Sequence, residues 1–315
     1  MSWLRPLGST GLVVSAVCLG GGPLGSMPRL FGEDVDAERG IATVLAALDS
    51  PIRFIDTSNG YSDGESERRI GAALTRVGGV PEGVVVETKT DPDGDDYSGD
   101  RVRRSVEESM ARLGMDHLPV VHLHDPEFHD FAAMTAPGGA VEALVGLKEQ
   151  GVVGAIGVAG GDVHVIARYL ELEVFDLLLT HNRWTLVDRS AGPIIAEAHR
   201  QQMGVLNAAV HGGGILGRQS DADSPTTYGY RPAPQPVLAA VRAMRAVCAR
   251  YGTDLPTAAL QFSVRDPQFA STIVGMSRPE RVAQNVAAAQ AQLPDDLFAE
   301  LETLVPAPEN WLDHP

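Results

Sequence analysis

The sequence of 315 residues predicts an α/β protein folded as a closed (β/α)8 barrel, the TIM-barrel architecture. Eight short apolar runs, rich in β-branched residues, end in polar residues or glycine, and stretches with helical character follow them. Unbroken apolar strands are typical of parallel sheets buried on both faces. Eight of them with intervening helices match a closed barrel, and an open doubly wound sheet is the alternative.

The first expected element is a hairpin ahead of the barrel strands. Residues 5–17 read RPLGSTGLVVSAV, in which Gly8-Ser9-Thr10-Gly11 forms a turn signal between two apolar runs. We expect this hairpin to plug the bottom of the barrel. The eight barrel strands are expected at residues 14–19, 52–56, 84–89, 120–124, 152–158, 175–181, 205–210 and 272–275.

Helices between the strands are predicted from capping residues and periodicity. In residues 101–113 apolar side chains recur at helical spacing, with Asp100 as the expected N-cap and Gly114 as the left-handed residue after the last turn. The same reasoning predicts helices at 141–150, 237–251, 255–264 and 279–291. Segments 91–99 and 217–236 are rich in turn formers, and we expect them to be irregular loops at the C-terminal mouth of the barrel.

Composition and charge narrow the class of protein. Hydrophobic residues at 44% and charged residues at 21% are ordinary globular values, and no linker divides the chain, so residues 1–315 are expected to form one domain. The formal net charge of −16 disfavours nucleic acid and membrane partners. The only cysteines, Cys18 and Cys248, are expected to be buried and unpaired in a cytoplasmic protein without membrane spans. Nothing in the sequence indicates the oligomeric state.

Chemistry is expected where polar residues end the apolar runs, because barrel active sites gather at the C-terminal ends of strands. Asp56, Lys89 and His124 end the second, third and fourth runs, and Tyr61 follows Asp56 in the next loop. A nearby ammonium lowers the pKa of a phenol from about 10. We therefore expect Lys89, paired with Asp56, to lower the pKa of Tyr61, and His124 to donate to a substrate oxygen. A lone Asp–Lys pair, however, is more often a structural salt bridge.

An ordered series of segments resembles the aldo-keto reductase superfamily. The segments are RPLGSTGLVVSAVCLGGG at the N-terminus, FIDTSNGYSDGESERRIGAAL at 54–74, VVVETKTD around Lys89, RSVEESMARLGMD at 104–116, and IVGMSRPERVAQN at 273–285. The resemblance spans nearly the whole chain. It implies that Asp56, Tyr61, Lys89 and His124 are the catalytic tetrad of an NAD(P)-dependent oxidoreductase, with Tyr61 as the general acid and base.

Two further segments resemble one branch of that superfamily. VHLHDPE at 121–127 and NRWTLVDR at 182–189 are similar to the aldose 1-dehydrogenases, which include L-fucose and D-threo-aldose dehydrogenases, and to pyridoxal 4-dehydrogenase. This likeness implies transfer of a hydride between nicotinamide and a sugar lactol or an aldehyde or ketone carbonyl. The implied partner is therefore a small sugar or aldehyde.

The resemblance also implies where the dinucleotide binds. NADP is favoured over NAD because Arg281 stands where an arginine for the 2′-phosphate is expected, although Gly275 replaces a lysine that many NADP-dependent relatives have. Ala159-Gly160 and His181 replace the usual Ser-Asn pair and glutamine that hold the nicotinamide amide. The cofactor contacts expected on this basis are Gly21, Gly22, Asp56, His181, His211, Gly214, Gly275, Met276, Ser277, Arg278, Arg281, Gln284 and Asn285.

Two other functions remain open from the residues. His122 and His124 lie two apart on one expected strand, and with His181 and His211 they could bind a metal as in barrel hydrolases. A non-catalytic, cofactor-binding regulatory subunit would share the fold. The dehydrogenase interpretation expects no metal ligands.

Overall fold

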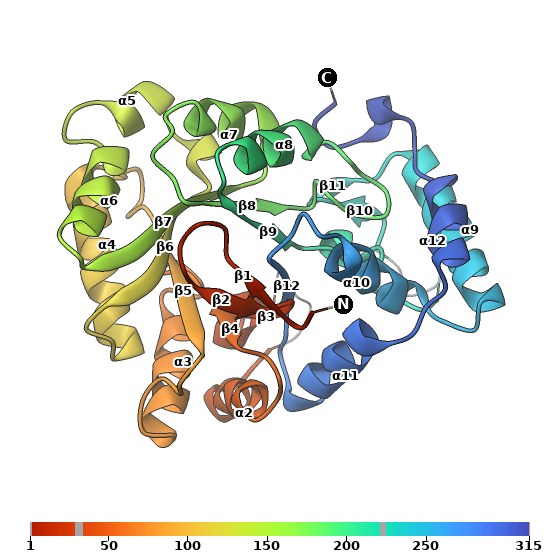
Figure 1. Ribbon diagram of the computed structural model, residues 1–315, viewed down its shortest axis with the longest axis horizontal. Coiled ribbons are helices and arrows are strands. Elements are labelled where there is room, and N and C mark those ends of the chain that lie inside the picture. The colour runs from red at the N-terminus through yellow and green to blue at the C-terminus, as the bar shows by residue number, and fades with distance from the viewer. Residues whose placement is uncertain (1, 29–33, 221–224, 315) are drawn as a thin grey trace.

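A computed structural model describes residues 2–28, 34–220 and 225–314, and its centre is a closed barrel of eight parallel strands (Figure 1). β12 pairs with both β3 and β9, so the sheet closes and the open-sheet alternative is wrong. The strands confirm the expected runs to within a few residues at each end. They are β3 Val17–Gly20, β4 Phe54–Asp56, β5 Val85–Thr90, β6 Leu118–His124, β7 Val153–Gly160, β8 Leu177–His181, β9 Gly204–Ala208 and β12 Ser271–Gly275.

The N-terminal hairpin is present and closes one end of the barrel. β1 (Leu4–Pro6) pairs antiparallel with β2 (Val13–Ser15). Leu7 and Val14, both 0% exposed, pack in one cluster with side chains that line the barrel interior. The expected strand at 14–19 was partly wrong, because one apolar run covers both β2 and the first barrel strand. The break falls at Ala16, whose backbone N–H donates to the Trp3 carbonyl instead of joining the barrel.

The helices surround the barrel, as Figure 1 shows. The five expected helices are present, but α4 is capped by Ser98, whose Oγ accepts from the Arg101 N–H at 3.3 Å, so the expected cap at Asp100 is wrong. Asp100 lies in the first turn, and Gly114 has the expected left-handed φ of 68°. The helices are α2 Ala37–Leu48, α3 Glu65–Arg76, α4 Gly99–Leu113, α5 Phe131–Thr135, α6 Ala140–Glu149, α7 Val163–Leu170, α8 Gly192–Arg200, α9 Gln235–Arg250, α10 Leu255–Arg265, α11 Pro279–Gln290 and α12 Asp295–Glu302.

Two long loops follow β5 and β9, as expected. The second is less irregular than its composition suggests, because it forms a short hairpin of β10 (Thr227–Tyr228) and β11 (Arg231–Pro232). Its residues 221–224 lie outside the described residues. Cys18 and Cys248 are buried and free, which confirms that expectation. Among the described residues no helix is both long and apolar enough to cross a membrane.

Candidate active site

The four residues expected to carry chemistry meet at the C-terminal mouth of the barrel. Asp56 is the last residue of β4, Lys89 is the penultimate residue of β5, and Tyr61 lies in the loop after β4. Lys89 Nζ donates to the Asp56 carboxylate, to the Thr57 carbonyl at 2.7 Å and to the Tyr61 hydroxyl at 3.3 Å. These three bonds use every N–H of the ammonium. The orientation of Lys89 is therefore fixed toward the phenol.

Burial dominates the electrostatics of this cluster. Asp56 and Lys89 are 3% and 2% exposed. Although burial alone would lower the pKa of Lys89, the charge of Asp56 raises it above its ordinary value, and Tyr61 and Glu87 add to this rise where they are ionised. Burial also raises the pKa of Tyr61, and Lys89 offsets this only in part. The expectation of a lowered Tyr61 pKa is thus wrong, because removing a phenolate from water costs more than one adjacent ammonium returns.

Polar contacts from α4 fix the loop that presents Tyr61. The Asn59 side chain donates to the Ser105 carbonyl and to Glu108, both at 3.1 Å, and accepts from Arg101 at 2.9 Å. Arg112 donates to the Asn59 carbonyl at 3.0 Å. Because hydrogen bonds hold both the side chain and the backbone carbonyl of Asn59, the loop has little conformational freedom two residues before Tyr61.

His124, the last residue of β6, is held by an aspartate from the neighbouring strand end. Its Nδ1 lies 2.6 Å from Asp91 Oδ1 and 3.1 Å from Ser58 Oγ. The ring packs edge-on against Tyr61, with centroids 5.7 Å apart. Burial alone would lower the pKa of His124, but the carboxylates of Asp91 and Asp125 raise it. The imidazole is thus stabilised as a cation beside the phenol.

These side chains open into a cavity of about 500 Å³, within the usual size range of small-molecule sites. Its walls combine polar groups with apolar side chains and glycines. The residues lining it are Gly20, Gly22, Pro23, Met27, Asp56, Gly60, Tyr61, Lys89, Asp91, His124, Asp125, Ala159, Leu179, His181, Ala208, Ala209, Tyr230, Ile273 and Gly275.

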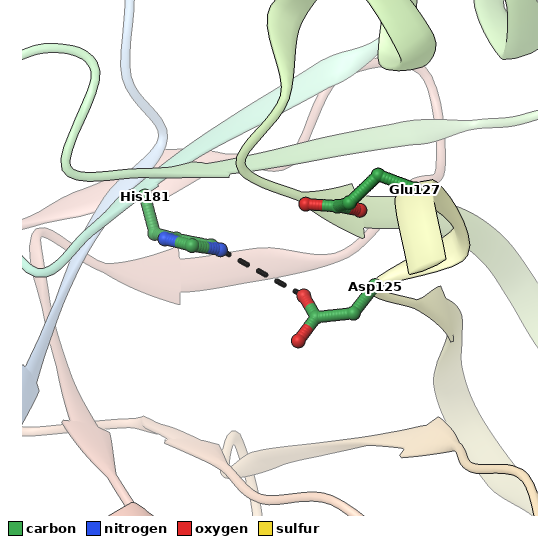
Figure 2. A group of neighbouring side chains, drawn as sticks. All are labelled: Asp125, Glu127 and His181. Atoms are coloured by element: carbon green, nitrogen blue, oxygen red, sulfur yellow. Dashed lines mark ion pairs between the residues drawn. The ribbon is translucent and has the colours of Figure 1, made fainter. Parts of the chain in front are cut away.

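Asp125 and His181 line the cavity, and Glu127 lies close to both of them (Figure 2). Asp125 Oδ1 lies 3.7 Å from His181 Nε2, and ligand atoms of Asp125, Glu127 and His181 lie within 4.8 Å of one another. The four histidines of the hydrolase alternative form no such group in the described chain. His122 pairs with Glu87 inside the barrel at 2.9 Å, and the His211 ring bonds the Pro256 carbonyl at 3.2 Å. That alternative is therefore wrong in its ligand set.

Comparison with known proteins decides the family. A model described as the aldo/keto reductase family matches residues 16–306. The chain belongs to this family. It is 30% identical to D-threo-aldose 1-dehydrogenase of Pseudomonas sp. (95% of this chain, 97% of that one) and 32% identical to L-galactose dehydrogenase of Arabidopsis thaliana (90% and 87%). A holo aldo-keto reductase structure from Bacillus halodurans superposes with a TM-score of 0.80 at 21% identity, covering 98% and 97% of the two chains.

Membership makes this aldo-keto reductase an oxidoreductase that uses a nicotinamide dinucleotide, and the relatives confirm the expected branch. The cavity suits such a group, because Gly20, Gly22 and Gly275 line one wall without side chains. A Cβ at position 275 would lie only 3.0 Å from Pro23 Cγ, a crowded contact that glycine avoids. A wall of glycines lets a flat or phosphorylated ligand approach the backbone closely.

The other expected cofactor residues fall into two sets. His181 lines the cavity beside Gly22 and Gly275, whereas Gly21, His211 and Gly214 do not line it. The Gly21 N–H instead donates to the Asp56 carbonyl at 2.7 Å, which holds the first strand end to the second. The segment after β12 leads directly into α11. It contains Met276 and Ser277, both buried, then Arg278 at the N-cap, with Arg281, Gln284 and Asn285 on the helix.

Sequence reasoning missed four side chains that belong to this region. Asp91 and Asp125 directly follow strand ends, so their position was a usable signal. Glu87 lies two residues before Lys89 on β5, and alternation along a strand places both on the inner face. Tyr230 lines the cavity from the loop after β9, which was expected at the mouth of the barrel, but no local pattern singled out this residue.

Proposed function

We propose that this aldo-keto reductase interconverts a sugar lactol and its lactone, or an alcohol and its carbonyl, with Tyr61 moving the proton. The observation that carries this proposal is the bonding of Lys89, which joins a buried carboxylate to the Tyr61 hydroxyl at the floor of the cavity. A buried Asp–Lys pair with no third partner would be structural. Here the ammonium has its remaining bond on a phenol that faces a ligand-sized space.

The residues of the chain divide the work of the reaction. Bound nicotinamide supplies or accepts the hydride. Tyr61, whose raised pKa keeps it protonated at neutral pH, donates its proton to a carbonyl oxygen in reduction and must lose it for oxidation. His124 directs Nε2 away from the Asp91 contact on Nδ1, so it can donate to the same oxygen. Oxidation should therefore accelerate as pH rises, and reduction should slow.

A polyhydroxylated substrate is favoured by the cavity mouth. Asp125 Oδ1 belongs to the cavity lining, is shielded from solvent and accepts no hydrogen bond in the described structure, with His181 Nε2 3.7 Å away. Buried acceptors without partners are costly unless a ligand satisfies them, and sugar hydroxyl groups are suitable donors. Two relatives named for oxidising aldoses point in the same direction.

NADP is the preferred form in this proposal. Arg278 and Arg281 lie at the start of α11, next to the glycine wall, and helix N-termini with arginines are favourable places for phosphate. Arg281 is exposed, and its Nη1 bonds Gln284 at 3.4 Å, a long contact that a phosphate could replace.

The test is a turnover screen with L-galactose, D-threo-aldoses and simple aldehydes, using each dinucleotide with the wild type and with Tyr61→Phe. The variant should lose about two to four orders of magnitude in kcat, the range of a general acid-base group, with dinucleotide affinity retained. Tyr251→Phe, at an exposed tyrosine on the far end of α9, is the matched control and should keep wild-type turnover. Unchanged kcat in Tyr61→Phe would refute the proposal.

A further inference from the structure

A second buried pair lies beneath the catalytic lysine and has no part in the mechanism above. Glu87 Oε2 and His122 Nε2 are 2.9 Å apart, and both side chains are 0% exposed. Glu87 precedes Lys89 by two residues on β5, and His122 precedes His124 by two on β6. Alternation places all four side chains inside the barrel. The pair therefore forms the layer directly below the active site.

The barrel interior closes around this pair. The Gly157 backbone of β7 lies against the His122 ring, since a Cβ at that position would collide with Nδ1 and Cε1. Neither His122 Nδ1 nor Glu87 Oε1 has a hydrogen-bond partner among the described residues. Both side chains are closed off from solvent. The hydrogen bond between the Glu87 carboxyl and the His122 imidazole is therefore the one that each group makes in the described structure.

The charged and titratable groups that act on the pair come from four strands. Lys89 on β5 and Asp56 on β4 face it from above, with His124 on β6, while the Cys18 thiol on β3 interacts with Glu87 from the side. Burial raises the pKa of that thiol, so Cys18 stays neutral. The remaining strands contribute apolar interior side chains: Ala155, Ala159, Leu177, Leu179, Leu206 and Ile273.

Lys89 cannot neutralise Glu87 through a hydrogen bond. Its three N–H groups are already directed to Asp56, Thr57 and Tyr61. An ionised Glu87 would thus be an additional buried anion with only His122 as a partner, which is unfavourable unless the pair holds one more proton.

We propose that Glu87 and His122 form a proton-holding pair that sets the charge beneath Lys89 and thereby tunes the proton affinity of Tyr61. They are positioning residues that act through Lys89, and this role rests on the proposed function of Tyr61. While the pair holds its proton it is neutral. Once the pair releases the proton, a negative charge lies one layer below the tetrad and raises the pKa of Tyr61.

The pH at which the charge changes follows from burial. Burial raises the pKa of Glu87 to about 8 and lowers that of His122 to about 3, so the pair is neutral at physiological pH and negative in mild alkali. Side chains two residues apart on a strand are about 7 Å apart, and the Tyr61 hydroxyl lies 3.3 Å from Lys89 Nζ on the far side of the pair. One charge about 10 Å away at an effective dielectric of about 20 therefore shifts the Tyr61 pKa by roughly one unit. Oxidation by the wild type should therefore rise with pH, flatten where Glu87 ionises, and then rise again.

The experiment measures single-turnover oxidation of L-galactose by the holoenzyme, saturated with dinucleotide, as a function of pH. Glu87→Gln cannot ionise, so its rate should match the wild type near neutrality, show no flattening, and exceed the wild type about tenfold by about pH 10. His122→Gln disturbs the same packing but keeps the carboxylate and donates to it. Because burial causes the raised pKa of Glu87, this variant should match the wild type near neutrality and keep the flattening. Glu87→Asp, which retains a carboxyl, should restore the flattening.

Three results would overturn the inference: coincident profiles for Glu87→Gln and the wild type, equal changes in both glutamine variants, or no flattening in the wild type. Failure of the proposed role of Tyr61 would be a separate result, because the Tyr61→Phe variant would then remain active. If Glu87→Gln does not fold, the unfolding free energy of His122→Gln gives a second readout. A group with a raised folded pKa contributes stability that is lost as pH rises through that pKa. In His122→Gln, as in the wild type, this loss should extend up to about pH 8, and a loss already complete near the ordinary pKa of a glutamate would contradict the proton-holding role.

Discussion

Replacing Asp91 by asparagine tests whether the charge of this residue keeps His124 protonated. Asp91 Oδ1 lies 2.6 Å from His124 Nδ1, and Oδ2 accepts from the Gly60 N–H at 2.6 Å. Asparagine keeps the shape but has one acceptor oxygen, so with that oxygen on the Gly60 N–H its amide N–H donates to His124 Nδ1, and the negative charge is gone. The change therefore separates electrostatics from positioning.

The magnitude follows from the type of contact that is lost. A charge-assisted hydrogen bond contributes about 1.5 to 3 kcal/mol, which corresponds to roughly one to two pKa units at about 1.4 kcal/mol each. In the wild type Asp91 and Asp125 raise the pKa of His124 despite its burial. In Asp91→Asn the pKa should fall by roughly one to two units, with Asp125 as the remaining nearby carboxylate.

The assay is kcat/KM for carbonyl reduction as a function of pH. If protonated His124 donates to the substrate oxygen, the rate declines as pH rises through its pKa, and in the variant this decline should begin roughly one to two units lower. Asp95→Asn, at an exposed position of the same loop, is the control and should leave the profile unchanged. A decline at the wild-type pH in Asp91→Asn would show that Asp91 only positions the ring.

Three further outcomes follow from the structure. Activity should survive exhaustive chelation by EDTA, measured as turnover, and a loss that zinc restores would assign a metal to the mouth of the cavity. Arg281→Ala should weaken NADP binding roughly ten- to a hundredfold in a fluorescence titration and NAD binding far less, whereas equal weakening would show that it does not contact the 2′-phosphate. Leu7→Ala, at a fully buried position of the hairpin plug, should lower the free energy of unfolding by about 2 to 5 kcal/mol. Leu4→Ala, half exposed on β1, should change it by less than about 0.5 kcal/mol, and equal losses would remove the plug interpretation.

The fold was predictable because most of the barrel strands are short apolar runs that end at a polar residue or a glycine; β9, which ends at Ala208, is an exception. The pattern failed where polarity does not mark a boundary. Residues 13–20 are apolar or small throughout, so nothing in the sequence separates β2 from β3, and only pairing partners divide them. The capping error at α4 has a similar origin, because Ser98 and Asp100 are both good caps and the packing of the first turn selects between them.

The site was predictable in position but not in electrostatics. Strand ends bring Asp56, Lys89 and His124 together, and this follows from topology alone. The pKa of Tyr61 does not, because it depends on how completely the phenol is removed from water and on charges from other strands. Sequence shows that an ammonium is near, which predicts a fall, whereas the fold supplies the burial that reverses it.

That reversal changes how the site must work. A phenol with a raised pKa stays protonated at neutral pH, so the protein by itself holds the proton that reduction requires. Oxidation requires the phenolate, and the carboxylates of Asp56 and Asp125 around it oppose that form. In a buried site the balance is sensitive to single charges, because their interaction is screened far less than in water. In the proposed mechanism, the charges that the barrel holds beside and beneath Tyr61 set its proton affinity, and with it the pH dependence of oxidation and reduction. The proposed pair of Glu87 and His122 contributes one of these charges.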